Sequence, residues 1–234
     1  MKKNVMMRIA AAMVVLTLLT TCVISSTFAK YTTSATLTDK ARVAKWGVAI
    51  EVTGDIFKES YNSDEVKSLG AVAEVSHVVA PNTNGSVTFS VSGTPEVAFD
   101  LAVSLETGYT DVYLKKKNGY LDYTVSPAGT FDLDADYYPV KFTLKKGTAT
   151  LVDKKSLADV ATALSGTSVS KTYTVSSTTI ADTYTLSWEW AASDNDKADT
   201  LLGNIAAGTV TGVDAADYSL TVGFTLKIEA TQTV

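Results

Sequence analysis

The chain of 234 residues has very little of the chemistry on which most enzymes depend. It contains one cysteine, Cys22, and one histidine, His77. A single cysteine excludes a disulfide within the chain and any site built from several thiolates. One histidine is too few for the paired histidines of a zinc-peptidase motif, so we interpret His77 as an ordinary strand or loop residue. No Gly-x-Ser-x-Gly elbow or glycine-rich phosphate loop supports a serine hydrolase or a nucleotide site.

Positive charge is scarce as well. Lysine and arginine number 20 against 25 aspartates and glutamates, and the net charge is −5. The main basic cluster, 115–117, falls in a predicted turn. Because no basic stripe is present to displace counterions from phosphates, nucleic acid is excluded as the main partner. With 46% hydrophobic and 19% charged residues, the composition is that of a folded domain.

The first 29 residues have the pattern of a secretory signal peptide. Three basic residues open the chain: Lys2, Lys3 and Arg8. An apolar run follows over 9–19, and Thr27 and Ala29 place small residues at positions −3 and −1 of a cleavage site. The pattern predicts cleavage between Ala29 and Lys30. Two alternatives stay open, an uncleaved membrane anchor and lipid attachment at Cys22.

The rest of the chain alternates apolar and polar residues with a period of two, which is typical of β-strands. In one segment Tyr184, Leu186, Trp188 and Trp190 share a face, which we interpret as core rather than as a sugar-stacking platform. A half-buried strand is predicted over 46–52. The other predicted strands span 86–92, 97–105, 140–144, 148–152, 172–175, 183–190 and 218–229.

Turn and helix signals complete the prediction. The Asn-Gly pair at 118–119 and the Lys-Gly pair at 146–147 each predict a hairpin turn. A helix is expected over 156–164, where Ser156 and Asp159 fit a capping box, and a shorter helical turn over 199–205. The fold class is therefore mainly β, an antiparallel β-sandwich with one or two short inserted helices.

Two clusters of aspartates are candidate calcium ligands, because carboxylate oxygens suit this ion. They are Asp132, Asp134 and Asp136, and then Asp194, Asp196 and Asp199. Neither cluster has the glycine and terminal glutamate of an EF-hand loop, so solvated acidic loops are the alternative. We expect no catalytic residue and no cofactor.

Several short segments resemble the TasA/camelysin family, also called CalY proteins. They lie at 27–31, 41–46, 80–86, 93–97 and 184–190, the last of which reads Tyr-Thr-Leu-Ser-Trp-Glu-Trp. The resemblance implies a jelly-roll β-sandwich, processing by a signal peptidase of the SipW type, and assembly into extracellular biofilm-matrix fibres. It is patchy in the middle, which implies a variable insertion near 106–182. Camelysins have also been classed as metallopeptidases.

The expected organisation is a signal peptide at 1–29, an extended segment at 30–40 and a sandwich domain at 41–234. Within 30–38, alternate residues form an apolar face: Tyr31, Thr33, Ala35 and Leu37. Cleavage would free this strand to join the sheet edge of a neighbouring copy, which predicts a head-to-tail homopolymer. Other matrix proteins are further candidate partners. A secreted metallopeptidase and a monomeric cell-surface adhesin stay open as alternatives.

Overall fold

The computed structural model describes residues 4–26, 43–58, 78–122, 129–175, 179–191, 195–210 and 212–233. The chain divides into two units, Met1–Val43 and Ala44–Val234. In the first, α1 spans Asn4–Ser26. Within the part of the chain that the structure describes, no helix combines the length and the apolar character needed to cross a membrane. The predicted cleavage site and the 30–38 segment lie outside the described residues.

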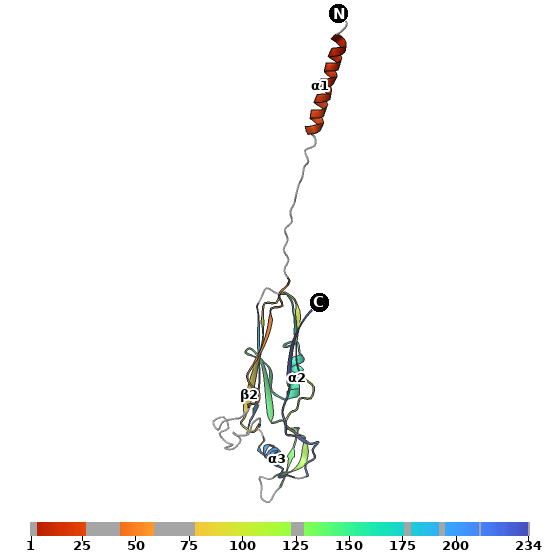
Figure 1. Ribbon diagram of the computed structural model, residues 1–234. Coiled ribbons are helices and arrows are strands. Elements are labelled where there is room, and N and C mark those ends of the chain that lie inside the picture. Colours follow the sequence, from red (N-terminus) through yellow and green to blue (C-terminus); the bar gives the residue numbers. More distant parts are fainter. Residues whose placement is uncertain are drawn as a thin grey trace. The chain divides into compact units, whose positions relative to one another are not determined.

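The second unit is an antiparallel β-sandwich with few helices, as the periodicity predicts (Figure 1). One layer is a five-stranded sheet with the order β1-β2-β10-β7-β8. The other contains a three-stranded sheet with the order β12-β3-β9, and helix α2, which packs on β3, β7 and β8. The first sheet consists of β1 (Val48–Thr53), β2 (Asn84–Gly93), β10 (Ile180–Trp190), β7 (Val140–Lys146) and β8 (Ala149–Lys155). The second layer consists of β12 (Leu226–Gln232), β3 (Phe99–Leu105), β9 (Lys171–Tyr173) and α2 (Leu157–Ser165).

Two short strand pairs and α3 (Asp196–Ala206) lie near one end of the sandwich (Figure 1). β4 (Tyr113–Leu114) pairs with β11 (Tyr218–Ser219), and β5 (Lys117–Asp122) pairs with β6 (Gly129–Leu133). The helical turn predicted at 199–205 is part of the longer helix α3. Its N-cap Asn195 accepts a hydrogen bond from the Ala198 amide, which explains why it begins earlier than the apolar pattern suggested.

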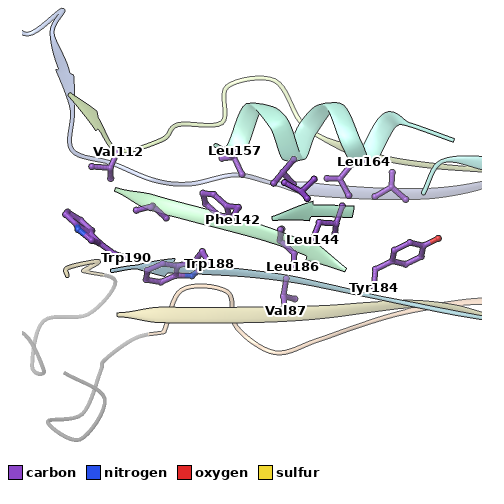
Figure 2. Close-up of a cluster of buried hydrophobic side chains, with 14 of the residues drawn as sticks. Val87, Val112, Phe142, Leu144, Leu157, Leu164, Tyr184, Leu186, Trp188 and Trp190 are labelled. Atoms are coloured by element: carbon purple, nitrogen blue, oxygen red, sulfur yellow. The ribbon is translucent and has the colours of Figure 1, made fainter. Parts of the chain in front are cut away.

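The core lies between the two layers. Figure 2 shows Leu157 and Leu164 of α2 facing Phe142 and Leu144 of β7, with side chains of β10 below them. The four β10 residues predicted to share a buried face are at most 6% exposed: Tyr184, Leu186, Trp188 and Trp190. Phe89 of β2 stacks on Tyr184 with ring centroids 4.8 Å apart. The tryptophans thus belong to the core, as predicted.

Helix α2 begins with the predicted capping box. The Ser156 hydroxyl accepts a hydrogen bond from the Asp159 amide, and the Asp159 carboxylate accepts one from the Ser156 amide. The helix ends before Gly166. Burial of Leu157, which is fully inaccessible, anchors the first turn of the helix to the core.

The hairpin predicted at 118–119 is wrong, because both residues lie within β5. Gly119 has a φ of +80°, and the register of β5 with β6 shifts between Lys117 and Tyr120. The Asn-Gly pair therefore forms a bulge instead of a turn. Both features demand a positive φ, so the dipeptide alone does not distinguish them. The turn predicted at 146–147 is confirmed, since β7 and β8 pair on either side of it.

One further strand prediction needs correction, and part of the predicted insertion can be placed in the fold. The strand predicted over 218–229 is interrupted: β11 pairs with β4, whereas β12 pairs with β3. The range 106–182, predicted as an insertion, contains β7, which lies between β10 and β8 and supplies Val140, Phe142 and Leu144 to the core. Part of that range is therefore integral to the sandwich, and its variability among relatives stays a prediction.

Candidate functional site

Strand β1 forms an edge of the five-stranded sheet and lacks the usual edge protection. Within the described chain it pairs only with β2, in unbroken register from Val48 opposite Gly93 to Thr53 opposite Thr88. Its one charged residue is Glu51, and it has no proline, lysine or bulge. Its second side thus presents backbone N–H and C=O groups to any further strand.

The apolar side chains of β1 are more exposed than a half-buried strand would allow. Ile50 lies opposite Val91 and Val52 opposite Phe89, and cross-strand partners share a face. Both therefore lie on the core side of the sheet. Nevertheless Ile50 is 36% and Val52 is 56% exposed, whereas Val91 and Phe89 are fully buried. Among the described elements, the close neighbour of β1 is β2, and β1 makes no comparable contact with β12, β3 or β9.

A depression of about 360 Å³ separates the end of β1 from the start of β12. Its walls are mostly apolar and include Val52, Ile56, Phe57, Val87, Phe224 and Leu226. Along β12, Ile228 and Ala230 are only half-buried. An extended segment with one apolar face could lie here, bonded to the edge of β1 and packed on these side chains.

The opposite edge of the same sheet is protected. Strand β8 ends in the charged run Asp153, Lys154 and Lys155, and its register with β7 is broken at two places. Lys154 has a φ of +49°, which distorts the strand further. Charges and bulges of this kind discourage the addition of another strand. Among the described residues, the sheet therefore has one open and one protected edge.

Two of the aspartates in the first predicted calcium cluster accept backbone hydrogen bonds. The Asp132 carboxylate accepts a hydrogen bond from the Gly119 amide at 2.8 Å, and Asp136 accepts one from the Lys116 amide at 2.7 Å. Asp134 is exposed. The first cluster thus orders the chain around β5.

The second cluster lies on or beside α3. Asp196 is in the first turn, where a negative charge interacts favourably with the helix dipole. Asp199 accepts hydrogen bonds from Tyr137 and Trp190. Asp194 and His77 lie outside the described residues. Among the described residues, no three His, Cys, Asp or Glu side chains are placed to hold a metal ion.

Sequence reasoning missed an ionic cluster around Asp182. This residue lies on the core side of β10, and its Oδ2 accepts hydrogen bonds from Lys146 at 2.9 Å, from Lys171 at 2.8 Å and from the Tyr173 hydroxyl. Burial alone would raise the pKa of Asp182, but these hydrogen bonds lower it to about 2. The sequence did contain a signal: Asp182 lies two residues before Tyr184 and so falls on the face of the strand that is otherwise apolar or aromatic.

A second carboxyl group has the opposite shift. Burial raises the pKa of Asp111 to about 6, although hydrogen bonds from the Leu157 and Val112 amides partly offset this. The bond from Leu157 joins Asp111 to the first turn of α2 at 3.1 Å.

These sites can also be weighed against known proteins. Comparison of the chain with protein-family models, with curated proteins and with solved structures finds no match. The function must therefore be argued from the geometry of the described residues and from the sequence pattern.

Proposed function

We propose that the mature protein assembles head to tail into extracellular biofilm-matrix fibres, in which residues 30–38 of one copy add to the β1 edge of the next. The observation that carries the proposal is the open β1 edge, with Ile50 and Val52 exposed on its core side. The resemblance to the TasA/camelysin family supports the same function.

The two partners are complementary in chemistry. In the 30–38 segment, Tyr31 and Leu37 lie on the face that would cover Ile50 and Val52. Its other face carries Lys30 and otherwise threonine and serine, like the outer face of the sheet, where Thr88 and Thr185 lie side by side. Each ladder hydrogen bond would contribute about 0.5–1.5 kcal/mol, and each fully buried aliphatic side chain about 1.5–3 kcal/mol.

The path of the chain before β1 favours a second copy as acceptor. Residues 45–47, which come just before β1, continue its direction beyond the start of the strand. The Thr94 amide donates to the Gly47 carbonyl, and the Glu96 amide donates to the Lys45 carbonyl. A segment that folded back onto its own β1 would have to reverse direction within residues 39–44. Donation to a neighbour requires no such reversal.

Processing would control assembly. A signal peptidase of the SipW type would cleave between Ala29 and Lys30 and give the segment a free N-terminus. The fibres would then form outside the cell, in the matrix or at the cell surface, with other copies and other matrix proteins as partners.

Electron microscopy tests this proposal. Protein that begins at Lys30 should form filaments, whereas protein that begins at Asp39 should stay a folded, soluble monomer. If instead the shorter protein melted at a lower temperature and the longer one formed no filaments at any concentration, the segment would complete its own sandwich and the proposal would be wrong.

A further inference from the structure

A second pocket lies between β9 and the start of β10, away from the β1 edge. Its volume is about 350 Å³, within the range of small-molecule sites. Strands from both layers form it: Lys171 and Tyr173 belong to β9, whereas Ile180 and Asp182 belong to β10. Pro95, which is buried, closes another side.

The ion cluster at this pocket extends beyond the residues that line it. Two ammonium groups, of Lys146 and Lys171, contact the single carboxylate of Asp182. Lys146 comes from β7 and does not line the pocket, whereas Lys171 does. The two ammonium groups share one carboxylate, so the cluster has one positive charge in excess, and Lys171 is the ammonium group that lines the pocket.

The same groups retain unused hydrogen-bonding capacity. All three donors to Asp182 meet at Oδ2, and no described residue donates to Oδ1. An ammonium group has three N–H donors, and Lys171 uses one of them on Asp182. The pocket thus offers cationic donors beside one carboxylate acceptor. Thr174 and Thr179, both exposed residues, also line it.

A carboxylate at a core position of β10 also needs a reason. The other inward residues of the strand are apolar or aromatic, whereas Asp182 is charged and half-buried. Departures from the local pattern are expected at functional sites.

We propose that this pocket binds a uronic acid, with the sugar carboxylate on Lys171 and a sugar hydroxyl donating to Oδ1 of Asp182. A uronic acid carries an anionic group and neutral hydroxyls on one ring, which matches the donor and acceptor arrangement. Its C–H face would pack on Pro95 and Ile180. The ligand of the protein outside the cell would then be an acidic polysaccharide, and binding would not depend on fibre formation.

Titration of the purified protein with three probes, followed by NMR or calorimetry, tests the proposal. D-glucuronate should bind saturably. D-glucose has the ring without the carboxylate, and inorganic phosphate has charge without the ring; both should bind more weakly by about tenfold or more. Absence of saturable glucuronate binding, or equal binding of glucose or phosphate, would overturn the assignment.

Variants locate the site. Lys171→Gln should lower glucuronate affinity by about tenfold, whereas Lys171→Arg, which keeps the charge, should retain most of it. Lys145→Gln removes an exposed lysine of β7 outside the pocket and should change the affinity less than about twofold. Near-ultraviolet circular dichroism checks that each variant is folded. Equal affinities of the Lys145 and Lys171 variants would place the ligand elsewhere.

Discussion

Asp182 joins the two layers of the sandwich through one carboxylate oxygen. Lys171 and Tyr173 reach it from β9, and Lys146 reaches it from β7. The Lys146 ammonium also lies 5.3 Å from the centre of the Tyr184 ring. Because all these groups are partly shielded from water, the cluster contributes more than an exposed ion pair would.

The lowered pKa of Asp182 predicts the pH range in which the cluster stabilises the fold. Its pKa of about 2 lies below the ordinary value of 3.8, so the ionised form is favoured by folding. This contribution is complete above about pH 4 and is lost as the pH falls toward 2. Asp182→Asn should lower the free energy of unfolding at pH 7 by about 1–2 kcal/mol, discounted for partial exposure.

Urea denaturation of both proteins between pH 2 and pH 7 checks this expectation. The two curves of stability against pH should converge at the acid end, since the wild-type carboxyl is then protonated too. A stability difference that stayed constant across the range would mean that the charge of Asp182 is not responsible.

Asp111 predicts the reverse dependence on pH. Its pKa of about 6 lies above the ordinary 3.8, so the folded state holds the proton more tightly than the unfolded state. Stability is therefore lost as the pH rises from about 4 to 6. Asp111→Asn keeps an acceptor for the Leu157 amide but cannot ionise. Relative to wild type, its free energy of unfolding should increase by about 2 kcal/mol between pH 4 and pH 7, measured by denaturation. Parallel curves would contradict this.

At the scale of elements, the two edges of the five-stranded sheet differ in how readily another strand could pair with them. β1 is regular and apolar on its core side, whereas β8 is bulged and charged. Strand β1 keeps six successive residue pairs with β2. The pairing of β8 with β7 instead shifts in register on both sides of Leu144 of β7. A strand added to β1 could therefore continue the sheet without distortion.

This difference predicts how single substitutions affect assembly. Val52→Lys places a charge on the open edge and removes an aliphatic contact of about 1.5–3 kcal/mol, so the critical concentration for filaments should rise by about tenfold or more. The domain should stay folded, because Val52 is 56% exposed. The measurement is sedimentation of filaments across a concentration series.

Two matched substitutions identify the edge. Thr150→Lys on β8 adds the same charge at the protected edge and should leave the critical concentration unchanged. Thr231→Lys adds the same charge to β12, the edge strand of the second layer, whose start borders the depression opposite β1. Inhibition by the β12 substitution alone would move the acceptor from β1 to β12.

At the scale of the whole molecule, processing and assembly are expected to be coupled. The small residues Thr27 and Ala29 predict that the secreted protein begins at Lys30. N-terminal sequencing of protein recovered from the culture medium should return Lys-Tyr-Thr-Thr. A lipid-modified N-terminus at Cys22 would instead indicate a membrane-anchored protein and would remove the proposed route to a free donor strand.

The sequence by itself determined what depends on neighbours along the chain. Alternation predicted the buried face of β10, and the Ser156–Asp159 pair predicted the start of α2, because side-chain direction and helix caps follow from local geometry. The tertiary structure decided what depends on distant residues. The exposure of Val52 follows from the place of β1 at the edge of its sheet, and the Asp182 cluster follows from the meeting of β7, β9 and β10. Periodicity indicates which side of a strand is apolar, but only the packing of the layers fixes whether that side is covered.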